Sequence, residues 1–356
     1  MKKGLYFIVI LFVAFSCREG DLVDIEYNPT PYIVEGTEYL GPIPLPPENQ
    51  LTHEGIKLGQ HLFYDPILSA NNSMSCASCH LPEKAFTDGN AVSVGIDGIA
   101  GIRSAMSLVN AAYFTKGLFW DGRSDNLEEQ ALLPVEDEIE LHHNWGDVIE
   151  EFKEHPTYPQ MFREAFGIED KEEIRKELAA KALAQFQRII ISGNSKFDRV
   201  NNGIGAFNEE QFVGLETFFD VNPLIADGEC GHCHNDPLFT TNQYFDNGIQ
   251  DAKTLTEYTD IGLANVTNRN LDYGKMRAPT LRNIELTAPY MHDGRFQTLE
   301  EVVEHYSKGG HATPNRDPLI RELGFSEEQK TGLVAFMKAL TDTSYLDNPY
   351  VRNPFK

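Results

Sequence analysis

The sequence predicts a mainly α-helical protein in which one small domain occurs twice in tandem. Three observations predict this class: several amphipathic segments begin with helix caps, alternating strand-like segments are few, and short motifs recur along most of the chain. At 356 residues the chain is long enough to bury two hydrophobic cores of ordinary size. We therefore expect two domains of similar construction.

The internal repeat consists of short motifs that occur twice in the same order. The first motif is Gly59–Asp65, and its counterpart is Gly214–Asp220. Four further pairs follow: Phe86-Thr87 with Phe239-Thr240, Ser107–Asn110 with Thr280–Asn283, Trp120–Arg123 with His292–Arg295, and Leu127–Glu129 with Leu299–Glu301. Because the body is two copies of one domain, differences between the copies should mark different tasks.

Each copy also contains a Cys-x-x-Cys-His motif, at Cys76–His80 and at Cys230–His234. This spacing is the attachment signature of c-type haem, in which two thiols add to the vinyl groups and the histidine is the proximal iron ligand. A Cys-x-x-Cys pair alone would also suit a redox dithiol or half of a zinc site. The histidine that follows it in both copies favours haem. We predict two cytochrome c-like haem domains, with covalent attachment through Cys76, Cys79, His80, Cys230, Cys233 and His234.

The N-terminal residues 1–17 are typical of a lipoprotein signal peptide. A basic start is followed by the apolar run Leu5–Phe15, and Ala14–Cys17 matches a relaxed lipobox. The apolar run is shorter than the about 20 residues that a membrane-spanning helix needs. We expect cleavage before Cys17 and a membrane anchor through its lipid, or, alternatively, a free cysteine in a plain signal peptide. Either case predicts export to the periplasm or cell envelope.

The rest of the chain divides by composition. Residues 18–50 are rich in proline, which predicts an extended tether that lifts the body off the membrane. The N-terminal haem domain is expected at 51–205, the C-terminal haem domain at 206–345, and a tail at 346–356. The segment 193–207 is rich in glycine and asparagine, which is typical of a domain boundary.

Three helices are predicted with some detail. Residues 171–192 are amphipathic and stop at Gly193, with apolar positions at Ile174, Leu178, Leu183, Phe186 and Ile190. The last helix begins at Ser326 with a capping box and has an apolar face formed by Leu333, Phe336, Met337 and Leu340. In the second copy, Thr298 begins a helix whose inward face is Leu299, Val302, Val303 and Tyr306.

This last face differs between the copies. The same offsets in copy one give Leu127, Gln130, Ala131 and Pro134. Pro134 thus stands where copy two has Tyr306. If the face points at the open side of the haem, Tyr306 can reach the iron and Pro134 cannot. An ordinary core tyrosine is the alternative, with Met276 and Met291 as other candidates for the sixth ligand of the second haem.

Copy one also has no histidine between Leu81 and Trp120, the loop from which a second axial ligand would come. Met106 lies there, but a lone methionine more often fills a core. We therefore predict an open iron at the first haem, with Gln130 nearby. An open iron suits the activation of a small oxidant, whereas two closed irons suit electron transfer.

Two further side chains fit this prediction. Glu140 is one of four acids in residues 135–141, and a carboxylate near an open haem can move a proton between peroxide oxygens. The residues alone do not choose among the four. Trp120 begins a motif at the domain junction, where it either packs in a core or shortens an electron path between the haems.

The overall charge limits the partners. Thirty basic and fifty-four acidic residues give a net charge of −24, which argues against a nucleic-acid partner. An acidic surface would attract a basic electron donor, or it serves solubility alone.

Together these motifs resemble the bacterial diheme cytochrome c peroxidase family over roughly residues 51–345. The resemblance rests on both Cys-x-x-Cys-His motifs and on Phe119–Arg123, Leu127–Ala131, Ala278–Asn283 and Ala288–Arg295. It implies that the N-terminal haem reduces hydrogen peroxide and that the C-terminal haem receives electrons from a small donor protein, of cytochrome c or cupredoxin type. It also implies that Trp120 lies between the haems, and that Gln130 and Glu140 are the glutamine and glutamate of the peroxide pocket.

Three departures from the family pattern accompany this resemblance. The distal histidine of the reductively activated members is missing, which implies a permanently open first haem. Tyr306 replaces a methionine ligand and, with Pro134, resembles the methylamine-utilisation branch, which oxidises tryptophans on a partner protein. The family's junction calcium, held by an asparagine and by carbonyls that match Thr287 and Pro289, is in doubt because Ser104 replaces the asparagine.

The leading hypothesis is thus a diheme peroxidase. The alternative is an oxidase that modifies tryptophan side chains of a partner protein. A non-enzymatic electron carrier is the second alternative, and it would need Met106, His142 or His143 to close the first iron. His232, within the second motif, is expected to be exposed.

Overall fold

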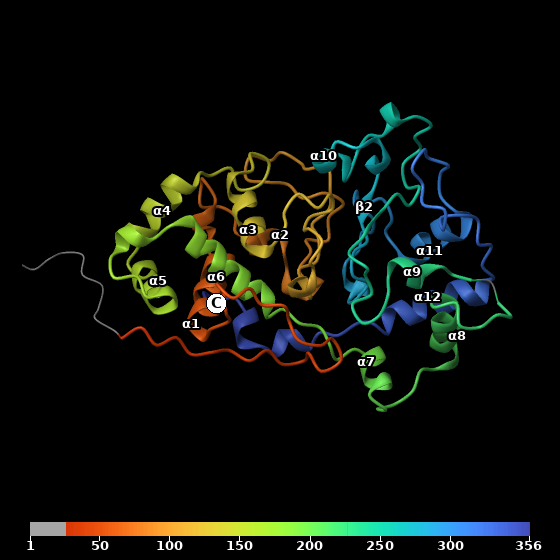
Figure 1. The fold of residues 1–356 in the computed structure, drawn as a ribbon, viewed down its shortest axis with the longest axis horizontal. Coiled ribbons are helices and arrows are strands. Elements are labelled where there is room, and N and C mark those ends of the chain that lie inside the picture. The colour runs from red at the N-terminus through yellow and green to blue at the C-terminus, as the bar shows by residue number, and fades with distance from the viewer. Residues whose placement is uncertain (1–25, 226) are drawn as a thin grey trace, which may run out of the picture.

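The computed structural model describes residues 26–225 and 227–356, and it contains two helical lobes that lie side by side (Figure 1). The N-terminal lobe is built from α1 (His53–Tyr64), α2 (Cys76–Cys79), α3 (Leu127–Glu136), α4 (Trp145–Glu154), α5 (Tyr158–Phe166) and α6 (Lys176–Arg188). The C-terminal lobe is built from α7 (Lys196–Asn201), α8 (Glu209–Phe218), α9 (Cys230–Cys233), α10 (Ala264–Thr267), α11 (Leu299–Lys308) and α12 (Glu327–Lys338). The predicted signal peptide and Cys17 lie outside the described residues.

The mainly α-helical class is confirmed. Across residues 26–225 and 227–356 the only sheet has two short strands, β1 (Tyr244–Phe245) and β2 (Met276–Arg277), which pair antiparallel. Within the same ranges no helix is both long and apolar enough to cross a membrane.

In each lobe the first and last long helices cross at a glycine. A Cβ atom at Gly59 of α1 would lie 2.0 Å from the carbonyl oxygen of Ala182 on α6. A Cβ atom at Gly214 of α8 would lie 1.9 Å from the carbonyl oxygen of Gly332 on α12. Because no side chain fits at either point, only glycine allows these backbones to approach so closely. The predicted repeat therefore corresponds to a repeated helix crossing.

The loop after each haem motif is fastened to the same place in both lobes. Asn110 accepts a hydrogen bond from the Ser192 backbone N–H (2.9 Å), just after α6. Its counterpart Asn283 accepts one from the Asp342 backbone N–H (2.6 Å), just after α12. Both asparagines have a left-handed backbone, with φ of 59° and 61°, which asparagine tolerates better than most residues. The repeat thus extends to individual hydrogen bonds.

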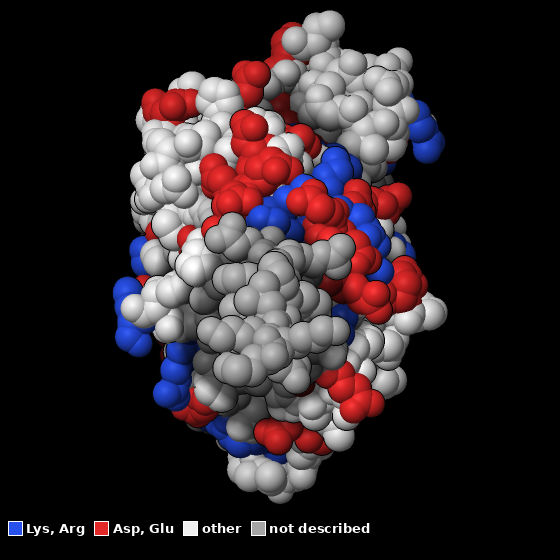
Figure 2. Space-filling view, turned by 90° about the vertical axis from the view of Figure 1, so that its left-hand side faces the viewer, with Lys and Arg blue, Asp and Glu red and all other residues white. Residues whose placement is uncertain are grey.

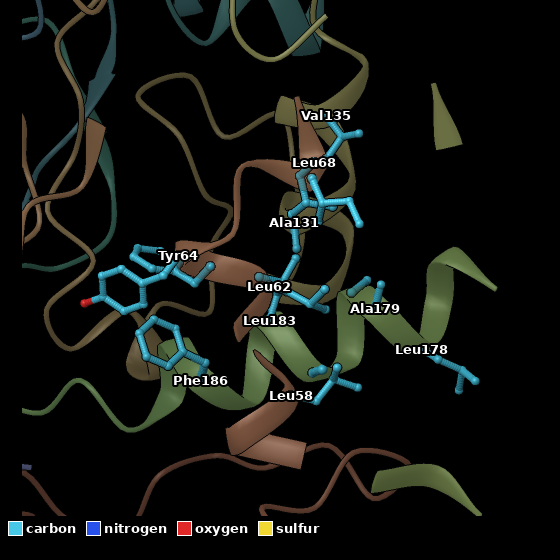
Figure 3. Close-up of a cluster of buried hydrophobic side chains, with 14 of the residues drawn as sticks. Leu58, Leu62, Tyr64, Leu68, Ala131, Val135, Leu178, Ala179, Leu183 and Phe186 are labelled. Atoms are coloured by element: carbon cyan, nitrogen blue, oxygen red, sulfur yellow. The ribbon is translucent and has the colours of Figure 1, made fainter. Parts of the chain in front are cut away.

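The core of the N-terminal lobe joins α1, α3 and α6. Figure 3 shows Leu62 of α1 and Leu183 and Phe186 of α6 within one apolar cluster, which also takes in Ala131 and Val135 of α3. Each fully buried leucine or phenylalanine of this kind contributes about 1.5–3 kcal/mol relative to an exposed side chain.

Two of the three predicted helices have the expected caps. The third ends earlier than predicted, because α6 stops at Arg188 with Ile189 as its C-cap, whereas Gly193 allows close approach of the Gly36 carbonyl. Residues 171–173 form a 3₁₀ turn and α6 begins at Lys176, while all five apolar positions predicted for this segment are buried. Ser326 accepts a hydrogen bond from the Gln329 N–H, and Thr298 accepts one from the Glu301 N–H, each at 3.2 Å. Both capping boxes are therefore confirmed.

The boundary between the lobes lies earlier than predicted. Phe197 of α7 packs in the C-terminal core, with its ring centroid 4.8 Å from that of Phe239. Asp198, also on α7, forms a fully buried ion pair with Arg282 (2.7 Å). Residues 196–201 therefore belong with the C-terminal core, and not with a domain that ends at residue 205.

The proline-rich segment does not project from the body over the residues that the structure describes. Leu40 is buried against Ala112, Tyr113 and Ile191, and the Tyr39 hydroxyl donates to Asp236 of the C-terminal lobe (2.6 Å). The expected tether at 18–50 is thus, from residue 26 onward, a strap on the protein surface. Burial of Leu40 stabilises this attachment, whereas Ile33 is exposed.

The C-terminal tail returns to the N-terminal lobe. Tyr345 and Val351 are buried in the N-terminal core, and the Gln60 side chain on α1 donates to the Arg352 carbonyl (2.7 Å). Figure 1 shows the C-terminus beside α1. The predicted tail at 346–356 therefore fastens one lobe to the other.

The exposed end of the N-terminal lobe carries both acidic and basic side chains (Figure 2). Figure 2 looks onto the end of the N-terminal lobe, where acidic and basic side chains alternate. Lys153 lies 2.8 Å from both Glu150 and Glu172, and Lys171 lies 2.9 Å from Glu154. Exposed pairs of this kind add little stability, but they prevent a uniformly acidic face here.

Candidate active site

Both candidate proximal histidines are fixed by backbone carbonyls. The His80 Nδ1–H donates to the Phe86 carbonyl (2.7 Å), and the His234 Nδ1–H donates to the carbonyls of Phe239 (3.1 Å) and Pro279 (3.0 Å). Burial lowers the pKa of both histidines. A neutral imidazole whose Nδ1 carries the proton leaves Nε2 free to bind iron.

The acceptor carbonyls come from equivalent positions in the two copies. Phe86 and Phe239 have left-handed backbones, with φ of 60° and 53°, which is uncommon for a bulky residue. The sequence comparison found the Phe-Thr pairs but did not assign them this task. The structure shows that they provide the acceptor that orients each histidine.

The four thiols are poorly suited to dithiol redox chemistry. The described cysteines form no disulfide, and burial raises the pKa of Cys76, Cys230 and Cys233 to about 12 and that of Cys79 to about 11. Dithiol exchange needs thiolates, which these surroundings disfavour. Neutral thiols beside an oriented histidine fit the covalent attachment of haem.

A largely apolar cavity in the C-terminal lobe contains the second motif. It is lined by Cys230, Cys233 and His234, and by the predicted inward face of α11, which consists of Leu299, Val302, Val303 and Tyr306. Such a lining suits a porphyrin. The helix face predicted from the sequence therefore points into the cavity that contains the second haem motif.

Tyr306 is held by an amide. The Asn247 Nδ2 donates to the Tyr306 hydroxyl (3.1 Å) and also approaches the Met291 Sδ (3.5 Å). Burial raises the pKa of Tyr306 to about 12, so that a cation is needed to make it a phenolate. Met276 and Met291 line the same cavity, so all three candidate sixth ligands lie around it.

The corresponding helix of the N-terminal lobe, α3, has Pro134 inside it and Gln130 one turn earlier. The Gln130 Oε1 accepts from the Gln187 Nε2 on α6 (3.3 Å), which keeps the Gln130 amide NH₂ as a donor toward another partner. Gln187 was not predicted. Its side chain is buried, at 5% exposed, and it directly follows Phe186. A glutamine within the apolar face of an amphipathic helix is the sequence signal that could have identified it.

Glu140 differs from the other acids of its segment. Burial, reinforced by Asp137 and opposed by Arg123, raises the pKa of Glu140 to about 6. Glu140 in turn raises the pKa of Cys76 and Cys79, which places its carboxyl near the first haem motif. Glu136 and Glu138 are exposed. Burial and charge thus distinguish Glu140, which the residues alone did not.

The ligands that an electron carrier would need have other partners. The Met106 Sδ accepts from the Arg277 guanidinium (3.6 Å). His142 pairs with Asp97 at the surface, and the His143 Nε2 lies 3.4 Å from Glu151.

Trp120 lies at the seam between the lobes. Its Nε1–H donates to the Ser104 carbonyl (3.0 Å), and its ring centroid lies 6.4 Å from that of His292, its counterpart in the repeat. Trp120 also lines the cavity of the C-terminal lobe, although it belongs to the N-terminal one. His232, as expected, is exposed, with its Nδ1 3.1 Å from Glu229.

The residues around Ser104 fit the implied calcium ion poorly. Thr287 and Pro289 line the cavity at the junction. However, the Ser104 hydroxyl donates to the Met291 carbonyl (3.1 Å), and the Ser104 carbonyl accepts from Trp120. The neighbouring Arg103 guanidinium lies 2.6 Å from Asp121 and 2.7 Å from Asp260, so the junction already has a cation.

Comparison with known proteins is consistent with this geometry. A family model described as Di-haem cytochrome c peroxidase matches residues 53–205. The chain is 34% identical over 330 residues to Cytochrome-c peroxidase IdrP1 of Pseudomonas sp. (strain SCT), covering 85% of this chain and 84% of that protein. It is also 34% identical over 298 residues to Methylamine utilization protein MauG of Methylorubrum extorquens, covering 84% of this chain and 81% of that protein.

The fold has a close counterpart among solved structures. A MauG-like protein associated with microbial copper homeostasis superposes with a TM-score of 0.81 at 33% identity, covering 90% of this chain and 98% of that one. The diheme peroxidase BthA of Burkholderia thailandensis shares the fold, with a TM-score of 0.69. The two attachment motifs, their oriented histidines and these relatives together show that the chain belongs to the di-haem cytochrome c peroxidase family, which implies two c-type haems.

Proposed function

We propose that the protein reduces hydrogen peroxide to water at the haem of its N-terminal domain, with electrons received through the C-terminal domain. The reaction consumes one peroxide, two electrons and two protons and releases two waters. The observation that carries the proposal is that Pro134 occupies the position of Tyr306, while Gln130 and Glu140 accompany it.

The chain's own residues supply binding and proton transfer in this proposal. The first haem, bound at His80, supplies the iron at which the peroxide O–O bond is cleaved. Gln130 donates its amide N–H to the peroxide, and Gln187 holds the amide in that orientation. Glu140, with a pKa of about 6, takes the proton of one peroxide oxygen and returns it to the departing oxygen.

The C-terminal domain stores and delivers electrons. His234 and Tyr306 are the proposed iron ligands there, and an anionic phenolate ligand would stabilise the ferric state. Trp120 lies at the seam, where an indole shortens the electron path. We infer a small donor protein of cytochrome c or cupredoxin type, and an exported protein anchored to the membrane by lipid on Cys17.

The test is the reaction of the purified, fully oxidised holoprotein with hydrogen peroxide in a stopped-flow spectrometer. We expect rapid spectral change without prior reduction, and electron paramagnetic resonance should show a high-spin ferric signal from the first haem. No reaction with peroxide would contradict a permanently open site. Two low-spin signals alone would favour the electron carrier.

Oxidation of a partner protein is a second candidate. Pro134 and Tyr306 favour it, as does the 34% identity to a methylamine utilization protein. Steady turnover with a reduced small cytochrome would favour the peroxidase. Peroxide-dependent oxidation of tryptophan in a protein substrate, without such turnover, would favour the second candidate.

A further inference from the structure

One arginine of the C-terminal lobe is buried without an acidic partner. The described chain buries three arginines: Arg188, Arg277 and Arg282. Arg188 pairs with Glu128 and Arg282 pairs with Asp198, each at 2.7 Å. Among the described residues, no carboxylate pairs with Arg277, which is 3% exposed. Burying a cation without an anion is costly, so this exception needs a reason.

The contacts that Arg277 does make are weak. Its Nη1 donates to the Asn242 Oδ1 (3.3 Å) and its Nη2 points to the Met106 Sδ (3.6 Å). Its Nε–H is buried without a partner. The guanidinium carbon lies 4.4 Å from the Phe114 ring centroid, which adds a cation–π contact. A thioether and one amide oxygen leave much of this five-donor group unsatisfied.

The position of Arg277 indicates which group could pair with its guanidinium. Arg277 lines the same cavity as Cys230, Cys233 and His234, which attach the second haem. Its backbone N–H donates to the Trp120 carbonyl (2.8 Å), which puts it at the seam with the N-terminal lobe. A c-type haem brings two propionate carboxylates into its cavity, and a guanidinium is the side chain best shaped to bind a carboxylate.

We propose that Arg277 binds a propionate of the C-terminal haem at the seam between the lobes, and so holds that haem and raises its reduction potential. A nearby cation favours the reduced iron because reduction removes one positive charge. This effect opposes that of an anionic Tyr306 ligand on the other side of the iron. The proposal rests on the haems that the family carries, and it stands whether the protein is a peroxidase or a partner oxidase.

The experiment uses the holoprotein with Arg277→Met, which keeps the volume and removes the charge, and with Arg277→Lys, which keeps the charge. Spectroelectrochemical titration gives the potential of each haem. For Arg277→Met we expect the equilibrium constant for reduction of the C-terminal haem to fall at least tenfold, or about 59 mV for one electron. Arg277→Lys should recover most of this loss.

Met106→Leu is the matched control, because it removes the sulfur contact and leaves the guanidinium in place. It should leave the potential of the C-terminal haem unchanged. A merely structural role for Arg277 would give equal potentials in Arg277→Met and the unaltered protein, with both haems attached, and would overturn the proposal.

Two further measurements complete the test. If a free anion were the partner, the potential of the unaltered protein would depend on chloride or phosphate concentration, and that dependence would overturn the proposal. If Arg277→Met fails to retain haem, resonance Raman spectra of the unaltered protein in H₂O and D₂O decide. A propionate that accepts from a guanidinium should show a deuterium shift, and its absence would exclude the contact.

Discussion

The two haem domains share one scaffold on the side of the proximal histidine and differ on the opposite side. Both have a glycine helix crossing, an asparagine clamp and a left-handed phenylalanine whose carbonyl orients the histidine. They differ on α3 and α11. Where α3 has Gln130 and Pro134, the equivalent positions of α11 have Val302 and Tyr306. The shared scaffold suits haem binding in both domains, and the changes on one helix face are the basis of the proposed division between reactivity and electron storage.

The difference also appears in the buried polar groups. In the N-terminal domain Gln187 donates to Gln130, and the Glu140 carboxyl lies near the first haem motif. In the C-terminal domain the position of Gln187 is taken by Met337, an apolar lining residue. Buried polar groups are costly, so each set points to a ligand: Gln187 and Glu140 fit the proposed peroxide pocket, whereas Arg277 fits the proposed haem contact of the C-terminal cavity.

Pro134→Tyr should have the largest effect on the difference between the two domains. It gives the first domain the ligand of the second and removes a proline from a helix interior, so α3 should persist. We expect peroxide reactivity to fall to background and the high-spin signal to become low-spin. Pro134→Leu is the control and should stay reactive. An unchanged high-spin signal in Pro134→Tyr would show that this position does not face the iron.

Arg282→Val tests a difference in stability. Val109 is the counterpart of Arg282 in the first domain, and the substitution leaves the Asp198 carboxylate buried without its partner. We expect the C-terminal domain to lose about 3–5 kcal/mol of its free energy of unfolding. Chemical denaturation followed at each haem measures this, and Arg282→Val combined with Asp198→Leu should recover much of the loss. Equal loss in both domains would contradict separate cores.

Glu140→Gln tests proton transfer in the first domain. Burial raises the pKa of Glu140 to about 6, and only the ionised carboxylate accepts a proton. The rate constant with peroxide should therefore rise as the pH increases through about 6. The variant should react about 100-fold more slowly and lose this pH dependence. Glu138→Gln, at an exposed neighbour, should behave like the unaltered protein, and a retained pH profile in Glu140→Gln would assign the titration elsewhere.

Gln187→Met should have the smallest effect. It gives α6 the residue of α12 and removes the hydrogen bond to Gln130. A net hydrogen bond contributes about 1 kcal/mol, so we expect the peroxide rate to fall about fivefold. In a Gln130→Met background, Gln187→Met should cause little further loss if Gln187 acts only by orienting Gln130. Fully additive losses would show that Gln187 acts independently.

Much of the architecture was predictable from the sequence because its signals are local. Covalent haem attachment needs a fixed spacing of cysteines and histidine, and a helix cap needs a fixed spacing of donor and acceptor. Ser326, Thr298 and the inward face ending at Tyr306 were therefore located correctly. The repeat also let one copy predict the organisation of the other.

The sequence predicts two haem domains that differ on one helix face. Four features are visible only in the tertiary structure. They are the strap from residue 26, the packing of Tyr345 in the N-terminal core, the contact of Gln187 with Gln130, and the burial of Arg277 without an acidic partner. These contacts join residues far apart in the chain. Burial and the identity of a partner across such a distance depend on packing, which no local spacing encodes.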